Sequence, residues 1–119
     1  MSSYRNHQNL LRKFIIESQK VFPKIRFFER HVGLFYTKNG TPIKINQPGM
    51  SDLWAIYPTD NGMIHLEFEI KSGASRQSKN QKVWQKFIES NNGLYIIVND
   101  EYNIAIGALG EYLKDNRLI

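Results

Sequence analysis

The stretch GMSDLWAIYPTDNGMIHLEFEIKSG, residues 49–73, decides the fold of this chain. Within residues 64–71, apolar and polar side chains alternate with the period of two that is typical of a β-strand. Residues 53–57 form a second apolar run, and the turn-forming residues 58–62 separate the two runs. We therefore expect a hairpin whose second strand carries Glu67, Glu69 and Lys71 on one face.

The charged face of this hairpin predicts a cation site. Buried carboxylates lose their hydration and need an ionic partner or a metal ion. Asp52 directly precedes the first strand, so the hairpin brings it near Glu69 and Lys71. Oxygen ligands suit Mg²⁺ or Mn²⁺, and a lysine beside such an ion orients or deprotonates a water that attacks phosphorus. The residues also allow another interpretation, an ion-pair cluster of Lys71 with Glu67 or Glu69 that binds no metal.

At these positions the chain resembles a known family of nucleases. The pattern Asp52, then Glu69-x-Lys71, resembles the PD-(D/E)xK signature. Three further features are more narrowly similar to its VRR-NUC branch, the virus-type replication-repair nucleases: the lead-in GMSDL at residues 49–53, Ser72-Gly73, and Ser78-x-x-Gln81. The resemblance covers most of the chain. It implies an α/β fold with a restriction-endonuclease-like core, a central mixed β-sheet flanked by α-helices, and it leaves a phage origin open.

The resemblance also implies an activity and a set of site residues. The implied protein is a metal-dependent endonuclease that hydrolyses DNA phosphodiester bonds in branched, flap or Holliday-junction-like DNA. Its catalytic residues would be Asp52, Glu69, Lys71 and Gln81, with Asp52, Glu69 and the backbone carbonyl of Ile70 holding Mg²⁺ or Mn²⁺. The nearby carboxylates oppose the lowered pKa that a base requires, so we favour orientation and electrostatic stabilisation as the role of Lys71.

Further residues are candidates for supporting roles. Candidates for contacts with nucleic acid are Arg30, Ser72, Arg76 and Lys79, of which Arg30 suits a bidentate contact with a phosphate. On the first helix, Glu17 is a candidate for a metal contact, and Gln8 stands where the resemblance places an acid. Glu67 shares the face of Glu69 and is a second-tier candidate ligand.

The rest of the chain predicts alternating strands and helices. We expect helices over residues 4–21 and 79–91, strands over residues 24–29 and 94–98, and a closing helix near the C-terminus. The order strand, helix, strand from Glu67 to Val98 predicts a parallel βαβ unit. Asn39-Gly40 predicts a hairpin within residues 34–46, which either presents Lys38 and Lys44 to a nucleic acid or simply has a solvated tip.

Composition favours a soluble intracellular, cytoplasmic protein of one domain. The 119 residues fit a single core, and the 16 Lys and Arg against 11 Asp and Glu give a net charge of +5 that favours a polyanionic partner such as DNA. The chain has no cysteine, and its beginning lacks the apolar segment of a signal peptide. We expect a homodimer and no membrane association. The alternative function is a nucleic-acid-binding module that has the same fold but is catalytically inactive.

Overall fold

The computed structural model describes residues 3–31 and 33–119 and contains three helices and six strands in that part of the chain. The helices are α1 (Ser3–Val21), α2 (Lys79–Ser90) and α3 (Tyr102–Asp115). The strands are β1 (Arg26–Glu29), β2 (Gly33–Tyr36), β3 (Pro42–Ile45), β4 (Leu53–Thr59), β5 (Gly62–Ile70) and β6 (Leu94–Val98). None of the helices in these described residues is long and apolar enough to cross a membrane.

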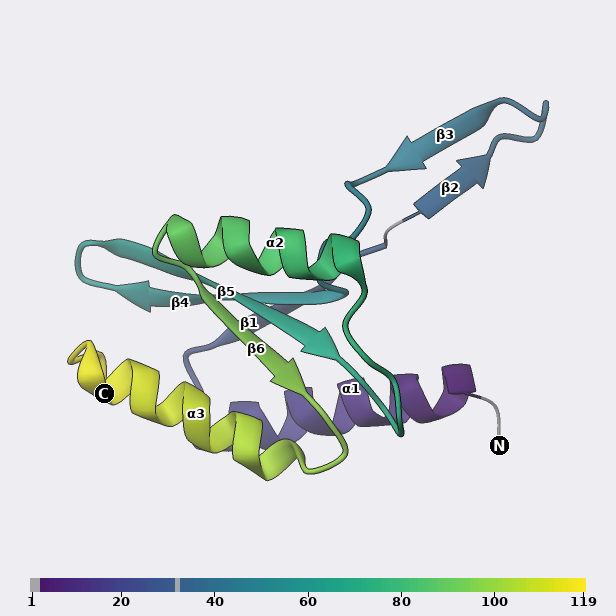
Figure 1. Ribbon diagram of the computed structural model, residues 1–119. Helices are drawn as coiled ribbons and strands as arrows, with labels where there is room; N and C mark the ends of the chain where they lie inside the picture. Colours follow the sequence, from purple (N-terminus) through teal and green to yellow (C-terminus); the bar gives the residue numbers. More distant parts are fainter. Residues whose placement is uncertain (1–2, 32) are drawn as a thin grey trace.

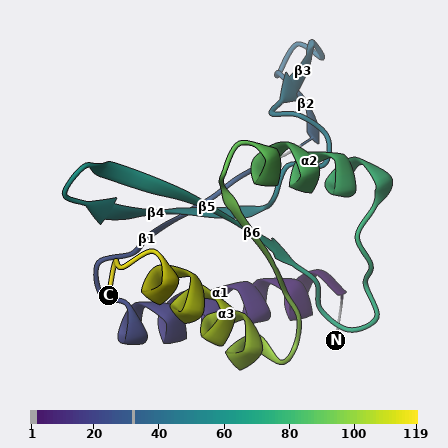
Figure 2. The same cartoon turned by 60° about the vertical axis from the view of Figure 1, so that its left-hand side comes forward.

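Four of the strands form a mixed sheet in the order β1-β4-β5-β6. β4 pairs antiparallel with both β1 and β5, whereas β6 runs parallel to β5 after the crossover through α2. Helices α1 and α3 cover one face of the sheet, and α2 covers the other (Figures 1 and 2). The prediction of an α/β fold with a central mixed sheet flanked by helices is therefore confirmed.

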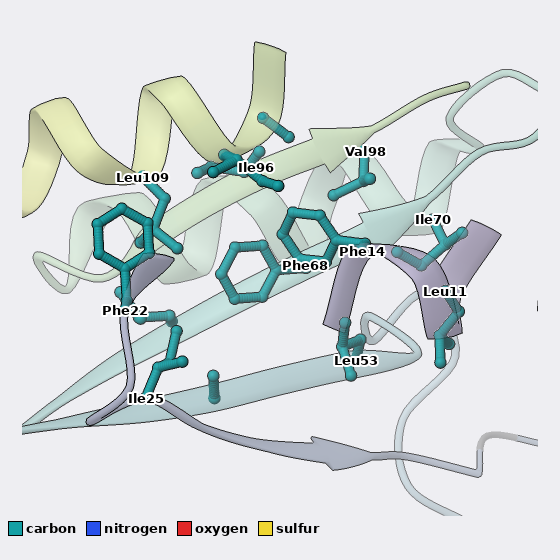
Figure 3. Packing of buried hydrophobic residues seen from close by; sticks show 14 of the residues in the cluster. Leu11, Phe14, Phe22, Ile25, Leu53, Phe68, Ile70, Ile96, Val98 and Leu109 are labelled. Carbon is teal, nitrogen blue, oxygen red and sulfur yellow. The ribbon is translucent and has the colours of Figure 1, made fainter. Parts of the chain in front are cut away.

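The hydrophobic core lies between the sheet and the layer of α1 and α3. Phe68 of β5 packs against Phe14 of α1, with 5.1 Å between the ring centroids, and Ile96 of β6 extends the same apolar face (Figure 3). Leu109 of α3 closes this cluster and is fully buried. The alternation in β5 therefore sends its apolar side chains into the core and its acidic side chains toward α2.

The β4–β5 hairpin differs in one detail from the prediction. Residues 58–62 were expected to form the turn, but β4 continues through Pro58 to Thr59, and Pro58 pairs with Met63. Within the described residues, the pairing of β1 with β4 ends at Ile56. Pro58, whose nitrogen cannot donate a hydrogen bond, therefore lies beyond the residues that pair with β1. The turn thus shortens to two residues, Asp60 and Asn61.

A second hairpin, β2–β3, projects from the body of the molecule (Figure 1). Among the described residues, its strands pair only with each other and not with the four-stranded sheet. The tip at Lys38 is exposed. Gly40 adopts a positive φ of 80° at the turn, in agreement with the signal of Asn39-Gly40. The side chain of Lys44, which was expected to face nucleic acid, lies outside the described residues.

Gly49 fixes the position of α2 relative to the sheet. Its φ is +89°, and a Cβ atom at this position would lie 2.3 Å from the backbone oxygen of Asn80 in the first turn of α2. No side chain fits at such a distance, and L-residues rarely adopt this φ. The segment before β4 therefore touches the helix backbone directly, and this contact brings the start of α2 over the end of the hairpin.

We predict that Gly49→Ala lowers the free energy of unfolding by at least about 1–3 kcal/mol, because the substitution adds a backbone strain and a steric clash. Gly73→Ala is the matched control, since Gly73 also has a positive φ (59°) but its Cβ would meet nothing within 4 Å. Urea denaturation of both variants measures the difference. Equal losses would show that the close contact with α2 is not a constraint on the fold.

Candidate active site

Asp52 and Glu69 lie side by side at one end of the β4–β5 hairpin. The register pairs Leu53 with Phe68, so the next positions along the two strands are Asp52 and Glu69. The backbone N–H of Ile70 donates a hydrogen bond to Oδ1 of Asp52 at 3.3 Å. The hairpin geometry thus brings together the two carboxylates that the sequence analysis assigned to a cation.

The environment of Glu69 favours its neutral form in the absence of a cation. Burial and the negative charge of Asp52 raise the pKa of Glu69 to about 8, although the Lys71 ammonium partly opposes this shift. The Glu69 side chain is almost completely buried, and its Oε1 atom has no hydrogen-bond partner among the described residues. A buried oxygen without a partner beside a second carboxylate is the arrangement that a bound cation would satisfy.

His7 is a site residue that the sequence analysis missed. Its Nε2 pairs with Oδ2 of Asp52, so the N-terminal part of α1 reaches the carboxylate pair. His7 precedes the buried Leu10 and Leu11 by three and four residues, so it extends the apolar stripe of α1 with a polar side chain. That spacing was the available signal.

The two first-helix candidates do not occupy this position. Glu17 forms an ion pair with Lys20 at 3.2 Å, and it lies about 15 Å from His7 along the helix axis. Gln8 is half-buried and is not among the side chains that line the cavity at Asp52. Among these α1 residues, it is therefore His7 that contacts Asp52.

Glu67 and Arg30 form a buried ion pair, which differs from both of their expected roles. Arg30 donates to Glu67 through Nη1 at 2.7 Å and Nη2 at 3.1 Å, and its Nη1 also donates to the backbone oxygen of Ser51. Trp84 donates to Glu67 at 3.0 Å, and His65 contacts the other carboxylate oxygen. Glu67 is 0% exposed, so it is a partner of Arg30 and not a ligand beside Glu69.

The electrostatics of this pair explain why the Arg30 guanidinium binds Glu67. Burial opposes the ionisation of Glu67, but the hydrogen bonds from Arg30 and Trp84 outweigh it and hold the pKa of Glu67 below its ordinary value. The guanidinium also lies 5.8 Å from the ring centroids of both Trp54 and Trp84. The bidentate contact that the sequence analysis assigned to a phosphate is therefore made with Glu67.

A cavity of about 390 Å³ opens at the carboxylate pair. Its lining combines the two acids with residues from the segment before β4 and from the start of α2: Arg30, His31, Gly49, Met50, Asp52, Glu69, Ser78, Asn80 and Gln81. We call this cavity the acidic cleft. Because Gly49 seats α2 against the hairpin, the first turn of α2 forms one wall of the acidic cleft.

Gln81 lies in the acidic cleft and also takes part in the cap of α2. Its backbone N–H donates to Oγ of Ser78 at 3.2 Å, and its side-chain oxygen accepts from the Ser78 N–H at 2.7 Å. This is a capping box, which satisfies two donors at the start of the helix. Only the amino group of the Gln81 side chain is left to face the acidic cleft.

Apart from Arg30, the basic candidates do not line the acidic cleft. Lys71 directly follows β5, is half-buried, and is close enough for its charge to lower the pKa of Glu69. Ser72 accepts a hydrogen bond from the Ser75 N–H through its backbone oxygen, while Arg76 and Lys79 are exposed before and at the start of α2. Lys79 stands in the chain between Ser78 and Asn80, which both line the acidic cleft.

Tyr95 is a second residue that the sequence analysis missed. It sits in the apolar run of β6, paired with Glu67 in the parallel register. Its hydroxyl accepts a hydrogen bond from Nε2 of Gln77 at 3.2 Å. Burial raises the pKa of Tyr95 to about 12, and the nearby negative charge of Glu69 acts in the same direction. The phenol therefore stays protonated beside the acids.

The donor set limits what the site can hold. In the described residues, no three His, Cys, Asp or Glu side chains are grouped so as to hold a metal ion. Two carboxylates, of which Glu69 has an unpartnered oxygen, remain the available anionic ligands. This fits Mg²⁺ or Mn²⁺, which keep several waters and take one or two carboxylates together with substrate oxygens.

Glu69 predicts a pH dependence of stability in the metal-free protein. Its carboxyl keeps its proton to about pH 8 when folded but loses it near 4.5 when unfolded, so the free energy of unfolding falls as pH rises through this range. Glu69→Gln is expected to flatten the fall, whereas Glu111→Gln on the exposed side of α3 is expected to keep it. Denaturant titrations in EDTA from pH 5 to 8 measure these slopes. Parallel slopes in the wild type and Glu69→Gln would contradict the assignment.

The Arg30 and Glu67 pair makes a second prediction. Arg30→Met leaves Glu67 as an uncompensated buried charge, so we expect a loss of about 3–5 kcal/mol in the free energy of unfolding. The double variant Arg30→Met with Glu67→Leu removes both charges and is expected to recover most of this loss. If Arg30→Met alone unfolds at the wild-type denaturant concentration, Arg30 does not act through Glu67.

Comparison with known proteins adds no family to these observations. No protein-family model matches the chain, and no curated protein matches it. The assignment of a function therefore depends on the residues of the acidic cleft.

Proposed function

We propose that this protein is a metal-dependent DNA endonuclease with a restriction-endonuclease-like core, as its similarity to the VRR-NUC branch of PD-(D/E)xK nucleases implies. The observation that supports this proposal best is the pair of adjacent carboxylates, Asp52 and Glu69, with an unpartnered Glu69 oxygen and the charge of Lys71 nearby. Ion-pair clusters that only stabilise a fold place a cationic partner on each buried acid, as Glu67 shows here.

In the proposed mechanism, Asp52 and Glu69 would hold a divalent cation, and the backbone carbonyl of Ile70 would complete the protein ligands. When bound, Mg²⁺ or Mn²⁺ supplies a lowered pKa for water and neutralises charge on the phosphate. Lys71 stabilises the negative charge that develops at phosphorus. The free amino group of Gln81 orients the phosphate or the attacking water in the acidic cleft. His7 holds Asp52 in position through its contact with Oδ2.

The proposed substrate is branched or flapped DNA. The net charge of +5 attracts a polyanion, and the exposed Arg76 and Lys79 are within two residues of Ser78, which lines the acidic cleft. Cutting two strands of a junction symmetrically calls for a homodimer, which is part of the same proposal. A catalytically inactive nucleic-acid-binding module with the same fold is the competing function, and it predicts binding without cleavage.

The test is cleavage of a labelled branched DNA in the presence of Mg²⁺ or Mn²⁺. We expect the wild type to cut. We expect Asp52→Ala and Lys71→Ala each to lower the rate by about 10²-fold or more, because the first removes a ligand of the cation and the second removes a positive charge beside the reacting phosphate. Glu17→Ala is the control, since Glu17 lies on α1 away from the acidic cleft. Circular dichroism checks that all variants are folded.

Two outcomes would contradict this function. If Asp52→Ala and Lys71→Ala cut as fast as Glu17→Ala, the acidic cleft is not the site of cleavage. If the wild type binds the DNA with a steep salt dependence but cuts it with neither metal, the protein is the inactive binding module.

A further inference from the structure

A groove of about 510 Å³ lies next to the acidic cleft. It runs between α2 and the segment that connects β3 to β4, and it is lined by Asn46, Gln47, Pro48, Met50, Asn80, Val83, Trp84 and Phe87. Met50 and Asn80 line both the groove and the acidic cleft, so the two hollows adjoin. We call this hollow the α2 groove.

The apolar side chains of the α2 groove are not part of the hydrophobic core. Val83 is 63% exposed and Phe87 is 56% exposed, although both are large apolar residues on the same side of α2. The rings of Trp84 and Phe87 stack, with 5.5 Å between their centroids. The hydrogen bond from Trp84 to the buried Glu67 fixes the indole in place. The α2 groove therefore presents a rigid aromatic surface to solvent.

A row of positive charge borders this aromatic surface. Lys79, Lys82 and Lys86 recur at helical spacing on α2, and Val83 lies four residues after Lys79 and three before Lys86. All three lysines are exposed, and none forms an ion pair within residues 3–31 and 33–119. The amides of Gln47 and Asn80 also line the α2 groove and offer donors and acceptors. The α2 groove thus combines stacking surface, amides and unpaired cations.

We infer that the α2 groove binds an unpaired nucleobase of a nucleic-acid strand whose phosphates follow the lysine row toward the acidic cleft. Single-stranded nucleic acid is bound by this combination, a basic track beside aromatic rings on which bases stack. The volume lies in the range of small-molecule sites, which accommodates a base. The inference rests on the proposed function and adds a substrate class, a strand with an unpaired segment beside the bond that is cut.

The charges argue against a second copy of this chain as the occupant. A two-fold contact places the same patch of each copy against the other. In this groove it would bring two rows of lysines together, and like charges at close range repel each other. A polyanion satisfies the same lysines, so charge complementarity selects a nucleic acid.

The test measures binding of a labelled single-stranded oligonucleotide in EDTA, where no cleavage occurs. Phe87→Ala is expected to weaken binding about 10-fold, because stacking on one aromatic side chain is lost, and to leave binding of a blunt duplex of the same length unchanged. Ile104→Ala is the matched control, since Ile104 is at least as exposed as Phe87 but belongs to α3, which covers the opposite face of the sheet (Figure 1). Thermal melting checks that both variants are folded.

A second arm uses an oligonucleotide in which the bases are replaced by abasic residues. The wild type is expected to bind it about 10-fold more weakly than the intact strand. Phe87→Ala is expected to bind both strands alike, because removing the ring and removing the base abolish the same contact, so their effects are not additive. Equal binding of intact and abasic strands by the wild type would overturn the inference. So would a dimer of the wild type that becomes a monomer in Phe87→Ala, because the groove would then hold a second copy.

The outcomes of this test distinguish a failure of the base site from a failure of the proposed function. Asp52→Ala is expected to keep the preference for intact over abasic strands, because the preference arises at Phe87. A wild type that prefers intact strands but never cuts refutes only the nuclease. A wild type that cuts but shows no such preference refutes only the base site.

Discussion

The pairing of β4 with β5 is the constraint on which the candidate site depends. A register that pairs Leu53 with Phe68 leaves Asp52 and Glu69 as the next neighbours, and it places both carboxylates at the same end of the sheet. A shift by one residue would exchange the two faces of β5, sending its acids into the core and its apolar side chains toward α2. The packing of Phe68 against Phe14 therefore fixes the acids as firmly as it fixes the core.

The two acids of β5 show how the surroundings give similar residues different roles. Glu67 accepts hydrogen bonds from Arg30 and Trp84, which lower its pKa, so it is ionised and links the sheet to α2. Glu69 lies two residues further along the same face, where burial and the neighbouring carboxylate of Asp52 raise its pKa more than Lys71 lowers it. A single strand thus carries one acid that is paired with a cation and one acid that has a buried oxygen without a partner, and the second is the candidate for chemistry.

Much of the fold and part of the site could be predicted from the sequence. The period of two at residues 64–71, the polar turn and the βαβ order were sufficient to predict the hairpin, the parallel unit and the proximity of Asp52 to Glu69. The mixed sheet flanked by helices was expected from the family resemblance. The partners of Arg30 and the contact of His7 could not be predicted in this way, because they join segments that are far apart in the chain. The role of the Gln81 side-chain oxygen in the helix cap could have been predicted, because Ser78 stands three residues earlier, the spacing of a capping box. The resemblance led us to consider only a catalytic role for Gln81.

The most direct test of the central claim is calorimetric titration of Mn²⁺ into the metal-free protein at pH 7 in buffers of different ionisation enthalpy. Because the pKa of Glu69 is about 8, the carboxyl is mostly protonated at this pH, and a cation that binds there must displace the proton. We predict one binding event that releases close to one proton, with the release lost in Glu69→Gln and binding lost in Asp52→Ala. Binding of Mn²⁺ that is unchanged in both variants, or no binding by the wild type, would contradict a cation site between these two carboxylates.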